Sequence, residues 1–162
     1  MTFLRKYTIQ QRFILLLVLF LASLMILSSI SLSQAYKSLL QQKHNANQQV
    51  VEAGYSVVEH FYQLQTQGTL TEEQAKKQAI EVLTAVRYDQ DNYFWINDYS
   101  PTMIMHPIKP ALIGKDVGGV KDPDGTELFI DMVKIVRAKG QGFVPYKWPK
   151  PGVDKPVDKI SF

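Results

Sequence analysis

The feature that most constrains this chain is an uninterrupted apolar run from Phe13 to Ile30, FILLLVLFLASLMILSSI. The run holds no charged residue, and small hydroxyls are its only polar groups. At about 1.5 Å per residue, roughly 18 to 20 helical residues span about 27–30 Å, which is the hydrocarbon thickness of a bilayer. The sequence therefore predicts a transmembrane helix over residues 13–32.

Two other interpretations of the run compete with a membrane anchor. A buried core helix is disfavoured because the run is apolar on every side. A cleaved signal peptide is supported by Ser33-Gln34-Ala35, which resembles a small-x-small cleavage site. However, the run exceeds the roughly 7–15 residues of a usual signal core, and the helical pattern continues past Ala35. We therefore interpret the run as an uncleaved anchor.

The distribution of charge orients this anchor. The formal net charge is +3, and Arg5, Lys6 and Arg12 precede the apolar run, whereas the other 15 basic residues balance all 15 acidic ones. A basic patch before an apolar segment indicates a cytoplasmic end, and it argues against a nucleic-acid partner. We expect a single-pass protein of the inner (plasma) membrane, with residues 1–12 cytoplasmic and residues 33–162 periplasmic or extracellular.

A long helix is predicted to follow the anchor, because residues 33–67 contain no proline and only one glycine, Gly54. Apolar residues recur there at helical spacing: Leu39, Leu40, Ala46, Val50, Val51, Val57, Val58, Phe61, Tyr62 and Leu64. From Val50 onward they form two adjacent stripes, which is more than packing against one partner requires. One stripe is expected to pack on its own domain and the other on a second copy, giving a homodimer through the long helix. The polar stretch 41–49 instead suits a solvent-exposed spacer.

The remainder of the chain predicts an α+β domain. Thr71-Glu72-Glu73-Gln74 has the form of a capping box, so a second helix is expected to begin there and to end near Arg87. Strands are predicted over residues 93–97, 102–106, 142–148 and 157–162, the last truncated by the end of the sequence. Between them we expect a loop over residues 107–122, and a helix that continues to Lys139 and is closed by Gly140.

Five short motifs occur in order along this domain: DNYFWIND at 91–98, MIMHP at 103–107, GKD at 114–116, DPDG at 122–125 and GFV at 142–144. So spaced, they resemble the single Cache sensor domain of methyl-accepting chemotaxis proteins over about residues 35–162. The resemblance implies a PAS-like antiparallel sheet on the long helix, with a covering helix. It also implies a pocket for small carboxylates such as acetate, propionate, pyruvate or lactate. Relatives continue into a second membrane helix, a HAMP linker and a methylated coiled coil, none of which this sequence contains.

The residues themselves also favour a small-molecule pocket. In a strand, Tyr93 and Trp95 share one face, and with His106 they supply aromatic walls that carry O–H and N–H donors. Lys109 follows on a loop that can fold over the pocket. Arg87 offers a bidentate clamp for a carboxylate. A weaker candidate, Tyr146, lies on a later strand.

Each candidate residue has a structural alternative. Tyr93 and Trp95 are also typical core aromatics, and His106 before Pro107 can cap the loop by bonding a backbone carbonyl. Lys109 suits a solvated loop. Arg87 suits the negative C-terminal end of the second helix.

Catalytic, metal and cofactor sites have little support in the sequence. It lacks cysteine, Gly-x-Ser-x-Gly, His-Glu-x-x-His and a phosphate-binding loop. His44 and His60 have no partner at metal spacing. The stretch beginning Val120-Lys121-Asp122 departs from a calcium loop at its first and twelfth positions. We therefore predict a non-enzymatic sensor region that needs no cofactor.

Other functions are left open by the sequence. The same outer domain can serve a histidine kinase or diguanylate cyclase, because the output module would follow Phe162. More remote alternatives are a membrane-tethered hydrolase and a structural membrane adaptor.

Overall fold

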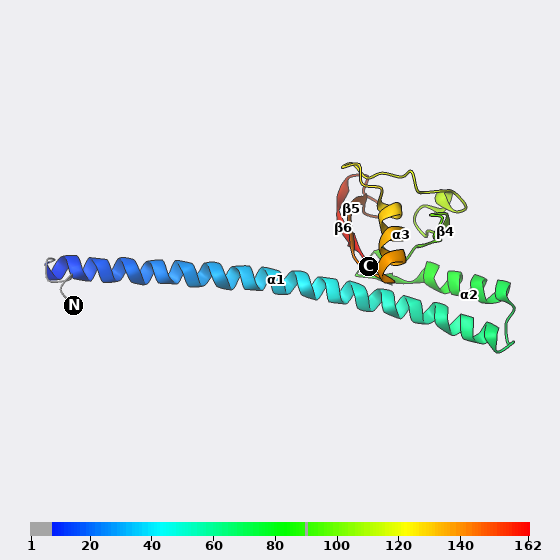
Figure 1. Ribbon diagram of the computed structural model, residues 1–162, viewed down its shortest axis with the longest axis horizontal. Coiled ribbons are helices and arrows are strands. Elements are labelled where there is room, and N and C mark those ends of the chain that lie inside the picture. Colours follow the sequence, from blue (N-terminus) through cyan, green and yellow to red (C-terminus); the bar gives the residue numbers. More distant parts are fainter. Residues whose placement is uncertain (1–7, 90) are drawn as a thin grey trace. The chain divides into compact units, whose positions relative to one another are not determined.

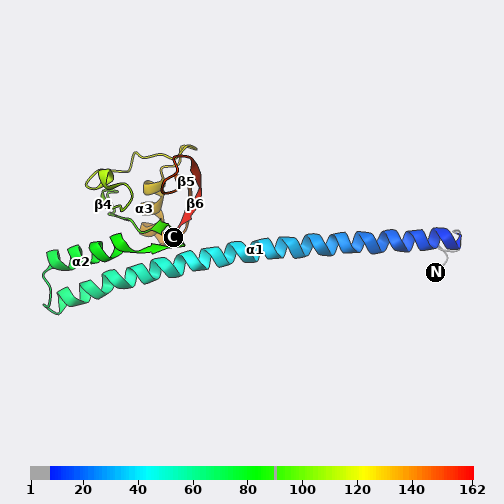
Figure 2. The same ribbon diagram turned by 180° about the vertical axis from the view of Figure 1, so that it is seen from behind.

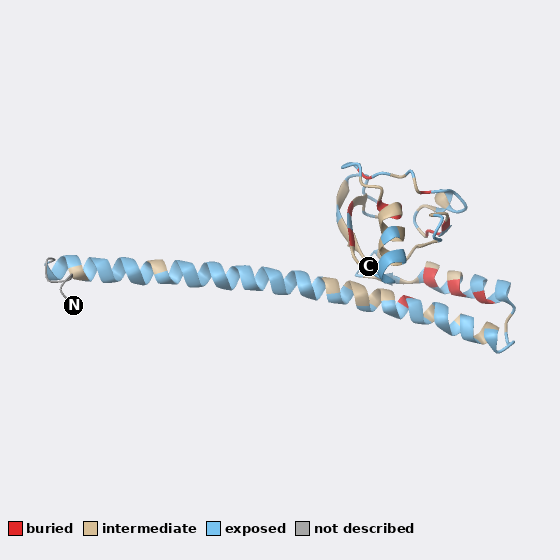
Figure 3. Cartoon of the chain, in the orientation of Figure 1, coloured by how far each residue is buried: buried red, intermediate tan, exposed pale blue. Residues whose placement is uncertain are grey.

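The computed structural model describes residues 8–89 and 91–162 and divides into two units, Met1–Asn45 and Ala46–Phe162. The helix α1 runs without a break over Ile9–Thr66, as the sequence predicted (Figure 1). In the first unit almost every described side chain of α1 is exposed, including the whole apolar run except Ala22 (Figure 3). By length and composition α1 can cross a membrane, and none of its apolar window is buried within the protein.

In the second unit, α1 is followed by α2 (Glu72–Ala85). Gly68 adopts a left-handed conformation, with φ of 75°, at the turn between the two helices. The predicted capping box is confirmed: the Thr71 hydroxyl accepts from the backbone N–H of Gln74 at 3.2 Å, and the Gln74 side chain accepts from the backbone N–H of Thr71 at 2.9 Å. The buried stripe of α2 consists of Ala75, Ala79 and Leu83.

The single strand predicted over residues 93–97 is wrong, because it is divided between two hairpins. The strand β1 (Arg87–Tyr88) pairs with β2 (Asn92–Tyr93), whereas β3 (Ile96–Asn97) pairs with β4 (Met103–Met105), both antiparallel. The tight turn after β1, where Asp89 has a positive φ of 44°, gives β2 its own partner. Residues 94 and 95 lie outside both ladders, so the backbone changes partner there.

The remaining elements also follow the predicted order. A short 3-10 helix, η2 (Pro110–Leu112), lies in the loop. The helix α3 (Leu128–Lys139) follows a turn at residues 122–125 and ends at Gly140, as expected, where φ of 78° is left-handed. The strands β5 (Val144–Pro149) and β6 (Pro156–Ser161) pair antiparallel along their whole length. Both views show α3 beside β5 and β6 (Figures 1 and 2).

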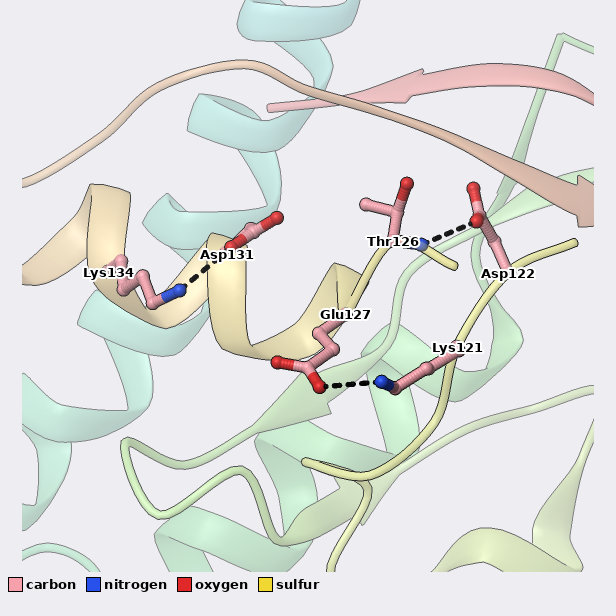
Figure 4. Close-up of polar contacts among 6 residues, drawn as sticks. All are labelled: Lys121, Asp122, Thr126, Glu127, Asp131 and Lys134. Carbon is pink, nitrogen blue, oxygen red and sulfur yellow. Dashed lines mark hydrogen bonds and ion pairs between the residues drawn. The ribbon is translucent and has the colours of Figure 1, made fainter. Parts of the chain in front are cut away.

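The turn that precedes α3 is held by Asp122, which is 7% exposed. Its Oδ1 accepts from the backbone N–H groups of Asp124 (2.9 Å) and Thr126 (2.8 Å), and its Oδ2 accepts from that of Lys147 (2.9 Å). Figure 4 shows the Asp122–Thr126 bond ahead of the helix. The carboxylate thus holds residues 122–126 in a turn and ties this turn to β5.

The core of the second unit lies where α3 faces β5 and the loop after β4. Its buried members are Met103, Val117, Leu128, Phe129, Val144 and Tyr146. Helices and small antiparallel ladders around one core make an α+β fold, as the sequence predicted, consistent with a PAS-like sensor.

Candidate ligand-binding site

A small cavity lies against this core, with a volume of about 10 Å³, close to the room that one water molecule needs. Its lining consists of six ring side chains and one leucine, namely Tyr93, Trp95, His106, Leu128, Phe129, Tyr146 and Trp148. Four residues singled out from the sequence as site candidates therefore meet here, although they come from three separate parts of the chain.

His106 is 3% exposed and follows directly after β4. Its Nδ1 accepts hydrogen bonds from the backbone N–H groups of Ile108 at 3.2 Å and Lys109 at 3.0 Å. The neutral ring therefore carries its proton on Nε2. Burial lowers the pKa of His106 to about 4, and the nearby charge of Lys109 adds to this effect. At neutral pH, His106 is thus an uncharged N–H donor. It also caps the loop, but it does so by accepting from backbone N–H groups and not, as the sequence suggested, by bonding a backbone carbonyl.

Two lysines bring positive charge to the cavity. The Nζ of Lys109 lies 4.2 Å from the centroid of the Trp148 ring, and the Nζ of Lys159 lies 5.7 Å from that of Tyr93. Burial lowers the pKa of Lys159, and the charges of Lys150 and Lys109 lower it further. Within the described residues, neither Lys109 nor Lys159 forms an ion pair with a carboxylate. The charge around the cavity is therefore positive and not neutralised by the domain's own acidic residues.

The remaining polar groups of the wall are neutral and already bonded within the protein. Burial raises the pKa of Tyr93, and it raises the pKa of Tyr146 to about 12. The hydroxyls of Tyr146 and Ser161 are hydrogen-bonded at 2.8 Å, and the indole N–H of Trp95 donates to the side chain of Asn97 at 3.3 Å. The groups best suited to an anion are therefore the imidazole and the two lysines.

Arg87 lies apart from these residues, because it does not line the cavity and is exposed. One of its guanidinium nitrogens donates to the backbone carbonyls of Thr84 at 2.7 Å and Val86 at 2.8 Å. These contacts match the alternative interpretation, in which Arg87 complements the C-terminal end of α2.

Sequence reasoning missed Trp148 and Lys159. Trp148 carries a local signal, because it alternates with Tyr146 and so shares its face of β5. Lys159 is the register partner of Tyr146 across the ladder, so its side chain emerges on that same face. Only the pairing of β5 with β6 reveals this placement. As for metals, no group of three or more His, Asp or Glu in residues 8–89 and 91–162 is placed to hold an ion.

Comparison with known proteins agrees with this geometry. Residues 24–162 match the family model described as the Cache domain. The whole chain is 42% identical to the methyl-accepting chemotaxis protein McpP of Pseudomonas putida, of which it covers 30%. A second relative, the sensor histidine kinase MctS of Rhizobium johnstonii, is 35% identical over 56% of this chain and 20% of its own length. The chain thus spans less than a third of the curated relatives that it matches.

Two solved structures are also similar, each with a TM-score of 0.73. One is described as the periplasmic sensor domain of a chemotaxis protein, with 45% identity over 75% of this chain and 84% of its own. The other, from work on carboxylic acid recognition by a Cache chemosensory domain, is 42% identical over 76% of this chain and 84% of its own. These two solved domains are chemotaxis sensor domains, which are non-enzymatic. Together with the apolar helix, they indicate a membrane protein with a sensor domain, and the chain belongs to the Cache domain family.

Proposed function

We propose that this chain is the sensor region of a membrane chemoreceptor, and that it binds a short-chain carboxylate at the cavity beside Tyr93 and His106. The observation that carries this proposal is the pair of lysines, Lys109 and Lys159, which have no acidic partner among the described residues. A small carboxylate supplies the missing negative charge.

The electrostatics favour an anion over a neutral or cationic ligand. The charge of Lys109 helps to lower the pKa of Lys159, and the charges of both lysines help to lower the pKa of His106, so a nearby negative charge would oppose these shifts. A buried anion needs such donors, because an unpaired buried charge is costly. The cavity has room for about one water molecule, so the rings that line it must move apart to admit even a short carboxylate, and this disfavours a large one. Carboxylic acid recognition by a similar Cache domain supports the same ligand class.

The membrane arrangement is part of this proposal. Residues 13–32 span the inner membrane and residues 33–162 form the ligand-binding domain on its periplasmic or extracellular side. Two copies associate through exposed side chains of α1, Tyr55, Val58 and Tyr62, which recur at helical spacing. Ligand binding biases two arrangements of the domain by its difference in affinity for them, and α1 conveys the change toward the bilayer.

A ligand screen tests the proposed class. The full chain, purified in detergent or nanodiscs, is titrated by calorimetry with acetate, propionate, pyruvate and lactate, and with ethylamine and glucose as a cation and a sugar. At least one carboxylate should bind, and at 100 times its dissociation constant it should stabilise the fold by about 2.7 kcal/mol. Binding of the amine or the sugar alone would reject the carboxylate class.

A second candidate is the sensor region of a histidine kinase, which the similarity to MctS favours. The ligand site would be the same and only the output would differ. Coexpression of the full-length protein with chemotaxis components, followed by measurement of ligand-dependent phosphotransfer, separates the two. Autophosphorylation on the receptor itself would support the kinase.

A further inference from the structure

A second cavity adjoins the proposed carboxylate site and is the larger of the two, at about 80 Å³. Tyr93 and Trp95 line both cavities, whereas Phe94, between them in sequence, lines only the second. The rest of its lining comes from α1, β1 and the end of the chain: Asn47, Val51, Tyr88, Ser161 and Phe162. The segment 93–95 is therefore the partition between the two spaces.

The two cavities differ in charge as well as in size. The imidazole of His106 lines the first cavity, and Lys109 lies over the ring of Trp148, which lines only that cavity. Lys159 lies over Tyr93, whose ring lines both cavities. The described lining of the second cavity includes no charged side chain. A carboxylate head therefore belongs in the first cavity, and an alkyl tail that outgrows it can extend only into uncharged space.

Tyr93 and Trp95, which line both cavities, differ in how many contacts hold their side chains. The ring of Tyr93 is tilted against the His106 ring with their centroids 5.1 Å apart, and the Nζ of Lys159 lies 5.7 Å from the Tyr93 centroid. Trp95 is half-buried, packs at the edge of the core and donates one hydrogen bond, to Asn97. Trp95 can therefore be shortened while the contacts of Tyr93 with the site are kept.

We propose that Trp95 sets the longest alkyl chain that the site accepts, by closing off the second cavity as a latent extension of the first. This inference rests on the proposed carboxylate function. The first cavity holds about 10 Å³ and admits no added methylenes, whereas the second has room for several water-sized groups. Each methylene buried there should raise affinity by about fourfold.

The test is a chain-length series, acetate through hexanoate, titrated into the full chain and its variants. The affinity of wild type should fall for carboxylates that are longer than propionate. In Trp95→Ala, the affinity for pentanoate relative to propionate should rise by at least about tenfold, which corresponds to two buried methylenes. The matched control is Phe94→Leu, which alters only the lining of the second cavity and leaves Trp95 in place, so it should not give this gain. If Trp95→Ala binds propionate normally and its affinity varies with chain length in the same way as that of wild type, the inference is overturned.

If Trp95→Ala does not fold, the milder Trp95→Phe replaces it as the shortened variant in both experiments. From the α1 side, Val51→Phe fills the second cavity from a position that is not part of the lining of the first. Propionate affinity should stay within about twofold of wild type, and in the Trp95→Ala background Val51→Phe should abolish the gain for pentanoate. A large loss of propionate affinity in Val51→Phe alone would show that the two cavities already form one site. If wild type binds no carboxylate at all, the proposed function fails and this inference fails with it. If wild type and Trp95→Ala bind carboxylates with the same dependence of affinity on chain length, only the inference fails.

Discussion

The ring of Phe94 lies directly against Gly54 of α1: a Cβ on Gly54 would stand 2.9 Å from Cε1 and 3.0 Å from Cζ of that ring. Gly54 is the buried residue of α1, and Phe94 lies between the two residues that line both cavities. This contact therefore joins the segment that walls the proposed site to the helix that continues from the apolar run.

The contact predicts an unusual response to a small substitution. Gly54→Ala should destabilise the fold by about 1 kcal/mol, because the cost of overpacking, roughly 1–3 kcal/mol, exceeds the helix-propensity gain of about 1 kcal/mol. In a Phe94→Leu background the ring is gone, so the same change should be neutral or stabilising. Thermal unfolding followed by circular dichroism measures both. Stabilisation by Gly54→Ala in the wild-type background would show that the ring is free to move away.

The buried histidine predicts acid sensitivity. The pKa of His106 is lowered to about 4, below its ordinary value of 6.5, so the unfolded chain binds more protons between these values. Stability should therefore be full above about pH 6.5 and fall by up to about 3 kcal/mol as the pH drops toward 4. Protonation of Nδ1 would also break both bonds that cap the loop.

Unfolding by urea across this pH range, in buffers free of carboxylates, measures the effect. His106→Gln should flatten the dependence, whereas His60→Gln, at an exposed position of α1, should leave it unchanged. If the free energy of unfolding of His106→Gln still falls with pH as it does in wild type, another group causes the acid sensitivity.

The turn before α3 predicts a second stability effect. Asp122→Ala should lower the midpoint of thermal unfolding by several degrees, because three backbone N–H groups lose their acceptor. Asp124→Asn is the matched control, since it keeps the backbone N–H and changes only a side chain that is exposed and pairs with Lys147 at the surface. Equal midpoints for the two variants would show that the turn does not depend on Asp122.

The exposed stripe of α1 predicts where two copies meet. Cysteines at Tyr55, Val58 or Tyr62 should crosslink in membranes, because these side chains are 69%, 39% and 63% exposed. A cysteine at Val51 should crosslink poorly, because Val51 is half-buried and lines a cavity of its own domain. The chain has no native cysteine to interfere. Crosslinking that is strongest at Val51 would contradict this arrangement.

Local signals in the sequence predicted the helices well. The capping box at Thr71, the stop at Gly140 and the unbroken α1 each depend on neighbours within a few residues, and all three are confirmed. The strand predicted over residues 93–97 was wrong, because alternation of side chains does not reveal that the backbone changes partner after Tyr93.

The candidate site could be predicted only in part, for the same reason. Tyr93 and His106 lie near each other in sequence and within recognisable motifs. Lys159 joins them because β6 returns beside β5, and this pairing is set by long-range packing rather than by any local pattern. Arg87 was a site candidate because of its charge, but its guanidinium group donates to backbone carbonyls at the end of α2 and does not line the cavity.

The most direct test of the proposed carboxylate site removes its two cations. Lys109→Met and Lys159→Met keep most of the side-chain length, and Lys155→Met, at an exposed position, is the matched control. Calorimetric titration of each full-length variant with the carboxylate that wild type binds most tightly should show a loss of about ten- to a hundredfold for Lys109 and for Lys159. The control should stay at wild-type affinity. Affinities within twofold of wild type in both lysine variants would contradict carboxylate binding at this site.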